Sequence, residues 1–284
     1  MTDDGLLYHY TSNEVFMNII ESDTLRLSSL DGTNDYQEGT WILDKYTDFL
    51  IKEGAELKKN TGESRRHKER ILAARNNFLG FAACFSQGGE KLSQWRGYAD
   101  NGKGVALCLN KEKMENFIKS INEQHKLNIR YGEIKYTESD HDKFIKQHIE
   151  KTIKKLSRSK NLTPEKEKDL INDQWASLFS HIYFHKNPAF KEEQEYRICL
   201  NVPVIELYEE IWAIRIGMKG KPFGIVPYIN FQYPKIKRRA VLGGMLEKVI
   251  LGSKNITPSN HLEFWLKTGG FENVTVEQSK ASYR

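Results

Sequence analysis

The sequence contains little cysteine and no long apolar run. Its 284 residues include three cysteines, Cys84, Cys108 and Cys199, and none of them belongs to a CxxC pair. A disulfide framework of the kind that staples small secreted domains is therefore not expected. No apolar stretch approaches the roughly 20 residues that a membrane-spanning helix needs, and no N-terminal stretch resembles a signal peptide. We accordingly expect a cytoplasmic protein that does not insert into a membrane.

An excess of charge of one sign is also missing. The chain carries 43 Lys and Arg against 38 Asp and Glu, which gives a formal net charge of +5. A dedicated nucleic-acid-binding domain usually concentrates more positive charge on one face. The runs KTIKKLSRSK and KIKRR are most simply solvated faces, although they leave a nucleic-acid partner open.

Familiar metal and nucleotide motifs are absent. HIYFH places His181 and His185 four residues apart, but Ile182 stands where a zinc protease would need Glu. The glycines of GMKGKPFG and VLGGML fit neither the Walker pattern nor the dinucleotide fingerprint, because no strand, glycine turn and helix follow in the required order. These glycine segments are interpreted as turns, and the sequence predicts no metal site.

The hydrophobic content of 39% is enough for a sizeable core, and we expect residues 1–284 to form a single domain. Many short apolar segments predict strands that do not alternate regularly with helices, which favours an α+β fold over a doubly wound parallel sheet. Strands are predicted in LLYHYTS, TLRLSSL, FLGFAACFS, GVALCL, IRYGEIKY, KEEQEYRICLNV, IWAIRIG, MLEKVILG and NVTVEQ.

The predicted helices lie between these strands and are expected on the outside. Ser12 is a plausible N-cap for NEVFMNIIES, residues 40–77 hold two helical stretches, and PSNHLEFWLKTG is a late helix. Residues 138–186 are lysine-rich and helical, and Pro164 suits the first turn of a helix there. We interpret this segment as a helical insertion.

The segment KEEQEYRICL carries more charge than a strand entering a core should need. Strand geometry would place Glu193, Glu195, Arg197 and Cys199 on one face. One interpretation is a solvated edge strand on which Arg197 offsets the glutamates. The alternative is a pair of functional carboxylates.

Other polar side chains lie in or beside apolar strands. His9 falls within LLYHYT, where a lone histidine is often a satisfied core residue, and Ser86 ends FAACFS. The connector that follows contains Trp95, Arg96 and Tyr98 in WRGY, a group that suits either plain packing or the clasping of a flat, charged ligand.

The segments LYHYTS, LRLSSLDGTNDYQEG, CFSQ, LSQWRGYADNGKGVAL, FHKNPAFKEEQEYRI and VILGS, in this order, resemble the bacterial family described as domain of unknown function 2971. That family in turn resembles ADP-ribosyltransferases, whose fold is a pair of small, mostly antiparallel sheets around an NAD cleft. In that arrangement His9, Ser86 or Tyr98, and Glu195 would occupy the three motif positions. Glu193 would be the upstream acid of an ExE pair.

The resemblance also implies a chemistry. A carboxylate at Glu195 would be favoured when the bond between nicotinamide and ribose breaks, because positive charge develops on the sugar. Glu193 would orient or deprotonate the incoming nucleophile, and His9 would hold a ribose hydroxyl. The implied cofactor-binding residues are His9, Tyr10, Ser86, Trp95, Arg96 and Tyr98, with Trp95 and Tyr98 stacking on nicotinamide and Arg96 or Arg26 meeting the pyrophosphate.

The function expected from this resemblance is NAD-dependent ADP-ribosyl transfer to an unidentified macromolecule, protein or nucleic acid, with NAD as co-substrate. Its biological role is left open between toxin, phage defence and housekeeping modification. Two alternatives stay open. One is an NAD glycohydrolase that transfers ADP-ribose to water, and the other is a non-enzymatic module that binds a protein or nucleic acid and has a vestigial cleft.

Overall fold

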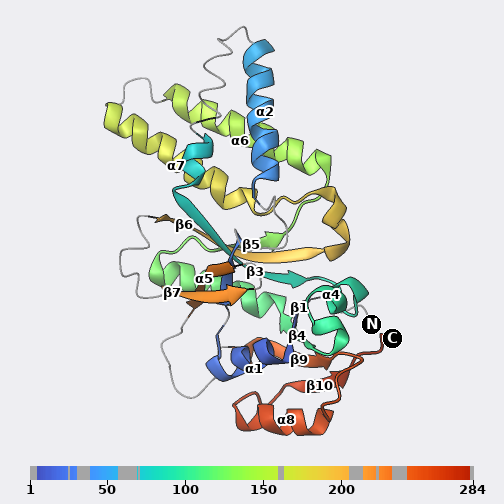
Figure 1. Ribbon diagram of the computed structural model, residues 1–284. Helices are drawn as coiled ribbons and strands as arrows, with labels where there is room; N and C mark the ends of the chain where they lie inside the picture. The colour runs from blue at the N-terminus through green and yellow to red at the C-terminus, as the bar shows by residue number, and fades with distance from the viewer. Residues whose placement is uncertain are drawn as a thin grey trace.

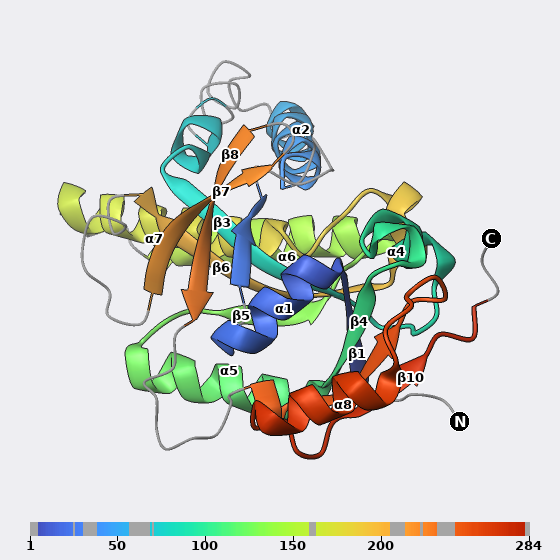
Figure 2. The same cartoon turned by 60° about the horizontal axis from the view of Figure 1, so that its bottom comes forward.

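The computed structural model describes residues 5–24, 26–30, 39–56, 69, 71–158, 163–204, 214–221, 224–231 and 242–281. Its described strands form one largely antiparallel sheet, in the order β10-β9-β4-β1-β3-β2-β8-β7, with β6 paired to β3 and β5 paired to β6 (Figures 1 and 2). The predicted α+β class is confirmed. The predicted pair of separate sheets is wrong, because β3 pairs with both β1 and β2 and so joins the two halves.

The strands are β1 (Leu6–Thr11), β2 (Arg26–Ser29), β3 (Phe78–Ser86), β4 (Val105–Asn110), β5 (Arg130–Glu133), β6 (Glu195–Pro203), β7 (Ile214–Lys221), β8 (Gly224–Phe231), β9 (Leu246–Leu251) and β10 (Thr275–Gln278). The α-helices with assigned bounds are α1 (Asn13–Ser22), α2 (Trp41–Glu56), α4 (Leu92–Gly97), α5 (Lys111–His125), α6 (Glu138–Arg158), α7 (Pro164–Ile182) and α8 (Ser259–Thr268). Short 3₁₀ helices are η2 (Asp100–Gly102), η3 (Pro188–Glu193) and η5 (Leu242–Gly244).

Most predicted elements appear near their predicted places. Ser12 caps α1 as expected, since its side chain accepts a hydrogen bond from the backbone of Val15 at 3.3 Å. Residues 138–158 and 164–182 are helical, with Pro164 in the first turn of α7. Whether they constitute an insertion stays a prediction. Within the part of the chain that the structure describes, no helix is long and apolar enough to cross a bilayer.

Helix α5 was missed by the sequence analysis, because its many charges hide a narrow apolar stripe. Met114, Ile118 and Ile121 recur at the spacing of one helical face, and all three are buried. The side chain of Asn110, at the end of β4, accepts a hydrogen bond from the backbone of Lys113 and so starts the helix. A second miss is the β7–β8 hairpin, where part of GMKGKPFG is strand and not turn.

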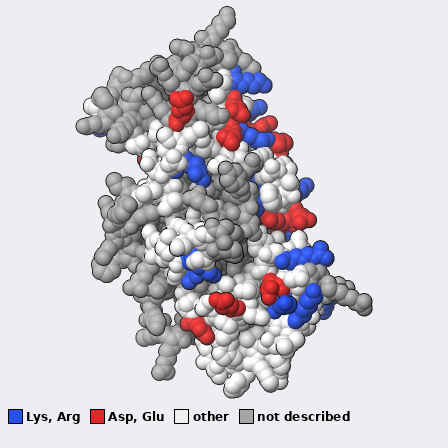
Figure 3. All heavy atoms as spheres, viewed as in Figure 1, with Lys and Arg blue, Asp and Glu red and all other residues white. Residues whose placement is uncertain are grey.

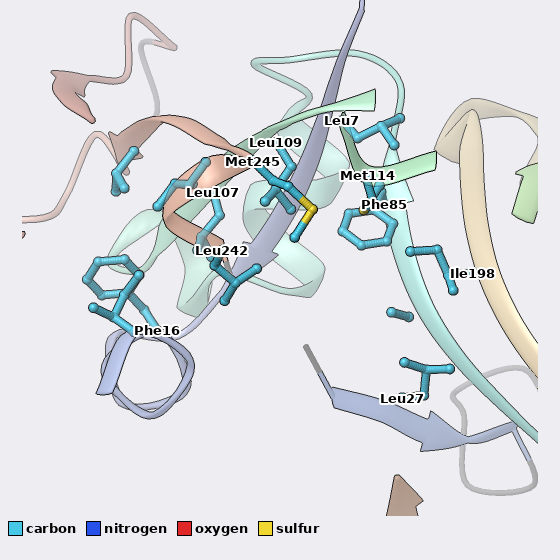
Figure 4. Close-up of a cluster of buried hydrophobic side chains, with 14 of the residues drawn as sticks. Leu7, Phe16, Leu27, Phe85, Leu107, Leu109, Met114, Ile198, Leu242 and Met245 are labelled. Carbon is cyan, nitrogen blue, oxygen red and sulfur yellow. The ribbon is translucent and has the colours of Figure 1, made fainter. Parts of the chain in front are cut away.

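Helices cover both faces of the sheet, and each layer has its own apolar cluster. On one face α1, α5 and α8 pack against alternate residues of β1, β3, β4 and β6; Leu7, Phe16, Leu107, Met114 and Ile198 belong to this core (Figure 4). On the other face α2, α6 and α7 cover the β3–β6 side, and α4 covers the β1–β4 side. The sheet face between these last two clusters is where the polar residues gather.

Candidate functional site

One edge of strand β3 pairs with two different strands. β1 pairs with it at Tyr8↔Ser86, and β2 pairs with it at Ser28↔Ala82. Between these points β1 turns away and pairs along its length with β4. The sheet is therefore open between β1 and β2, beside the segment 83–85 of β3.

A cavity of about 380 Å³ lies at this opening. Its size falls within the range of roughly 300–1,000 Å³ that is usual for small-molecule sites. Seven of the residues proposed from the sequence line it: His9, Tyr10, Arg26, Ser86, Tyr98, Glu193 and Glu195. The structure thus brings to one cavity residues that lie up to 186 positions apart in the sequence (9 to 195). What they do there stays a prediction.

The two glutamates reach the cavity from different elements. Glu193 ends the 3₁₀ helix η3, which begins at the cap Asn187, and Gln194 then adopts a left-handed conformation with φ of 44°. Strand β6 begins only at Glu195. The prediction that Glu193 and Glu195 alternate on one strand is therefore wrong for Glu193, because the backbone changes direction at Gln194.

Strand β6 is also not a solvated edge. It pairs with β3 on one side over its full length and with β5 on the other. Glu195 is 6% exposed and Arg197 is 1% exposed. As predicted, Glu195, Arg197 and Cys199 share one face while Tyr196, Ile198 and Leu200 pack in the core on the opposite face.

Four charged side chains form a buried cluster at this end of the cavity. Arg197 donates from Nε to Glu195 Oε1 at 2.5 Å and from Nη2 to Glu195 Oε2 at 2.9 Å. Lys186 donates to Glu193 Oε2 at 2.7 Å and lies 3.4 Å from Glu195 Oε2. Arg197 also donates to the backbone carbonyl of Tyr183 at 2.8 Å. Because two carboxylates face two cations, the formal charge of the cluster is zero.

This arrangement keeps Glu195 ionised. Burial alone would raise the pKa of its carboxyl, but Arg197 and Lys186 favour the charged form and together lower the pKa to about 2. The Cys84 thiol lies beside this carboxylate, and burial followed by the charge of Glu195 raises the pKa of Cys84 well above its usual value. Glu195 is therefore a fixed negative charge, and Cys84 stays protonated.

Lys186 is the member of the cluster that the sequence analysis missed. It follows α7 in FHKNP, where no periodic pattern marks it as buried. Its backbone N–H donates to the carbonyl of Lys135, whose own N–H donates to the carbonyl of Phe184. These two bonds hold the connector against the segment before α6, and the ammonium consequently lies between the glutamates with 6% exposure.

His9 sits at the opening in the sheet. Its Nδ1 lies 3.0 Å from the carbonyl oxygen of Cys84. A carbonyl can only accept, so Nδ1 carries the proton and Nε2 is an acceptor in the neutral ring. Burial lowers the pKa of His9, which keeps this ring neutral. The histidine thus both caps a backbone group that β1 leaves unpaired and lines the cavity.

Ser86 and Tyr10 mainly brace the loops that frame the cavity. The Ser86 hydroxyl lies 3.1 Å from the Glu193 carbonyl and 3.2 Å from the Gly88 carbonyl, to which it can donate. The Tyr10 hydroxyl accepts from the backbone of Lys91 at 3.3 Å. Lys91 Nζ in turn donates at 2.7 Å to the side chain of Gln194, so that the loop after β3 holds the end of η3 in place.

The three large side chains of WRGY, Trp95, Arg96 and Tyr98, lie in different surroundings. Tyr98 lines the cavity and is 45% exposed, and burial followed by the charge of Glu193 raises its pKa to about 12. Trp95 is instead buried against Tyr10 with ring centroids 4.9 Å apart, and Arg96 is exposed. Neither Trp95 nor Arg96 lines the cavity, so the expected clasp around a ligand is reduced to Tyr98.

The HIYFH histidines belong to a separate group between α6 and α7. His148, His181 and His185 lie around Phe144, and His141 contacts His185 with ring centroids 5.3 Å apart. His181 is neutral and fully used, because Nδ1 donates to the Ser177 carbonyl at 2.6 Å and Nε2 accepts from Arg130 at 2.9 Å. Burial, the largest influence, lowers the pKa of His185 to about 3. Among the described residues, no group of three or more potential ligands could hold a metal ion.

Comparison with known proteins gives one match. Residues 94–198 match the family model described as "Protein of unknown function (DUF2971)". The resemblance to this family is confirmed for these residues, while the quoted segments before residue 94 and VILGS lie outside the match. The matched DUF2971 segment begins in α4 and ends within β6, and it includes Tyr98, Lys186, Glu193, Glu195 and Arg197. No curated protein and no solved structure matches the chain.

Proposed function

We propose that this protein is an NAD-dependent ADP-ribosyltransferase-like enzyme that modifies a macromolecule, either a protein or a nucleic acid. The observation that carries the proposal is that His9, Tyr98, Glu193 and Glu195 line one common cavity. A fixed carboxylate beside a second acid is the pair of groups that cleavage of a glycosidic bond uses around the sugar, and a neutral imidazole and an aromatic ring can position the substrate there.

Glu195 would stabilise the positive charge that develops on the ribose as nicotinamide leaves. Its carboxylate is ionised and immobile, so no reorganisation is needed when that charge appears. The neighbouring cations Arg197 and Lys186 weaken its field at the same time. Because these cations reduce its electrostatic effect on the sugar, we propose that Glu195 also accepts a hydrogen bond from a ribose hydroxyl.

Glu193 is better suited to act on the acceptor. Among the described residues only its Oε2 has a hydrogen-bond partner, Lys186, and its side chain is more exposed than that of Glu195, 16% against 7%. A carboxylate oxygen that has no protein partner can orient or deprotonate an incoming hydroxyl or amine. Transfer and hydrolysis would then differ in their need for Glu193.

His9 and Tyr98 would position NAD. The Nε2 acceptor of His9 can take a hydrogen bond from a second ribose hydroxyl, because Nδ1 is fixed by Cys84. Tyr98, at the exposed side of the cavity, can stack on the nicotinamide ring and shield the reacting bond from water.

The neutral charge cluster favours a second candidate, a non-enzymatic binding module with a vestigial cleft. Both oxygens of Glu195 are already used by Arg197 and Lys186, which is also what a purely structural ion-pair network would look like. On the described surface in Figure 3, however, Lys and Arg are interspersed with Asp and Glu, so that view offers no single-sign face for nucleic acid.

The deciding experiment uses the intact protein, labelled NAD and a cell lysate, followed by separate protease and nuclease treatment of the labelled material. We expect label on a macromolecule and release of nicotinamide. Nicotinamide release with free ADP-ribose as the sole product would identify a glycohydrolase. Absence of both NAD binding by calorimetry and nicotinamide release in the lysate would support the binding module and reject the enzyme.

A further inference from the structure

The wall of the cavity opposite β6 is basic and polar. It is built from β2, β8 and the edge strand β7, which pair in that order. The Arg26 guanidinium lies 3.8 Å from the centroid of the Tyr228 ring, and its Nε donates to Asn230 Oδ1 at 3.1 Å. Arg26, Asn230 and Lys219 all line the cavity. Stacking and a hydrogen bond therefore fix the direction of the guanidinium.

These side chains share a sheet face with Glu195. Ser28 is opposite Ala82, so Arg26, two residues earlier, projects to the same side as Ala82 and Cys84. Arg26 is opposite Asn230, and Lys219 is opposite Val226, four residues from Asn230. Neighbouring strands lie about 4.8 Å apart, so β2 is about 10 Å from β6 and β7 is about twice as far.

The cations at this wall differ from Arg197 and Lys186 in their partners. Among the described residues, neither Arg26 nor Lys219 lies within ion-pair distance of a carboxylate. Arg26 is partly buried, and a partly buried guanidinium is costly unless its donors are satisfied. Asn230 offers a further donor. Its Oδ1 accepts from Arg26, so its Nδ2 is the group that can donate to a ligand.

We infer that Arg26, Asn230 and Lys219 form a phosphate subsite that takes the diphosphate of a nucleotide. The planar Arg26 guanidinium keeps its Nη donors for a bidentate contact with one phosphate. Lys219, an exposed ammonium on the edge strand, adds a second charge farther from β6. The link to NAD rests on the proposed function, whereas recognition of phosphate follows from two cations that have no carboxylate partner in the part of the chain that the structure describes.

The test is calorimetric titration of the intact protein with ADP-ribose, with ADP and with nicotinamide riboside, which has no phosphate. Arg26→Gln should weaken ADP-ribose and ADP at least tenfold, the usual range for a charge-assisted hydrogen bond. Lys219→Gln should weaken them several-fold, and both losses should shrink at high salt. Nicotinamide riboside should bind each variant within twofold of the wild type. The matched control Lys267→Gln, an exposed lysine on α8, should change nothing.

If Arg26→Gln disturbs folding, Lys219→Gln still tests the subsite. Lys219 is exposed, so its substitution should leave the fold intact. The inference is overturned if no phosphate ligand binds at millimolar concentration, or if Lys219→Gln and a correctly folded Arg26→Gln bind ADP-ribose like the wild type. A single-stranded oligonucleotide that binds more tightly than ADP and displaces it would also overturn it, since the phosphate would then belong to a nucleic acid. Nicotinamide release that persists unchanged in both variants would reject the subsite and leave the proposed enzyme standing.

Discussion

At the β6 end of the cavity four charges pair with one another, whereas at the β2–β7 end two cations have no carboxylate partner among the described residues. Arg197 and Lys186 are 1% and 6% exposed and hold Glu195 and Glu193 in fixed positions. Arg26 and Lys219 are partly buried and exposed, respectively. At the first end each charge has a partner of opposite sign, whereas at the second neither cation has one among the described residues.

This difference separates the cations that the fold pairs, Arg197 and Lys186, from the cations that a ligand could pair, Arg26 and Lys219. A buried ion pair contributes little net stability, but removing one partner strands the other charge in a low-dielectric site. A cation at the edge of a cavity that has no carboxylate partner can be removed at small cost, because its removal leaves no buried charge unpaired. The two ends should therefore respond in opposite ways to substitution, with stability affected at one and binding at the other.

The largest effect is expected from Arg197→Met, which breaks the paired end. Glu195 would keep only Lys186 as a partner, and the free energy of unfolding should fall by about 3–5 kcal/mol. Urea denaturation at neutral pH measures the loss. Lys267→Met on the surface of α8 is the control. Equal stability of Arg197→Met and wild type would show that the cluster does not hold β6 to its surroundings.

Acid should weaken the paired end in a defined pH window. The pKa of Glu195 is about 2 in the folded protein against the ordinary 4.5, so the unfolded chain binds the proton more tightly. Its contribution, of the order of 3 kcal/mol, is complete above pH 4.5 and is lost as pH falls toward 2. Urea midpoints of wild type and Glu195→Gln between pH 6 and pH 3 measure this. The gap between the two proteins should narrow on acidification, and a constant gap would contradict the assignment.

The two glutamates of the paired end are expected to differ in their effects on catalysis. Glu195→Gln preserves shape but loses the charge, so nicotinamide release should fall by roughly a hundredfold or more, with a smaller change in NAD affinity. Glu193→Gln should lower transfer to the acceptor while slow hydrolysis partly persists, because water needs less orientation than a specific nucleophile. Nicotinamide release and label transfer are measured separately for each variant. Equal and small effects of both substitutions would make the cluster structural.

The smallest effect on stability is expected from Lys219→Gln. Its ammonium is exposed and has no carboxylate partner among the described residues, so the urea midpoint should match that of the wild type. A clear loss of stability would mean that Lys219 pairs within the folded chain. That result would remove the contrast between the two ends.

Local sequence patterns predicted most of the elements but not how far each extends. The alternation in EYRICL correctly assigned Tyr196 and Ile198 to the core face and Arg197 to the other. The same reasoning failed one step upstream, since a left-handed residue at Gln194 ends the alternation before Glu193. An isolated Gln carries no signal for that conformation, which glycine or asparagine would have given.

The candidate site was predicted in part. The resemblance pointed to His9, Tyr98, Glu193 and Glu195, which line the cavity, and also to Trp95 and Arg96, which do not. Trp95 was misplaced because its tryptophan ring is equally suited to packing and to a ligand, and only the arrangement of α4 against β1 and β4 buries it.

The sequence by itself determined the α+β class, the cap at Ser12, the faces of β6 and the similarity of residues 94–198 to the DUF2971 family model. These depend on residue types at fixed local spacing. The tertiary structure alone decided that β1 and β2 leave β3 at different points, that Lys186 lies between two glutamates, and that the described partners of Arg26 are neutral. Those features depend on which strands pair and in which register, and pairing over long sequence separations leaves no local periodicity to read.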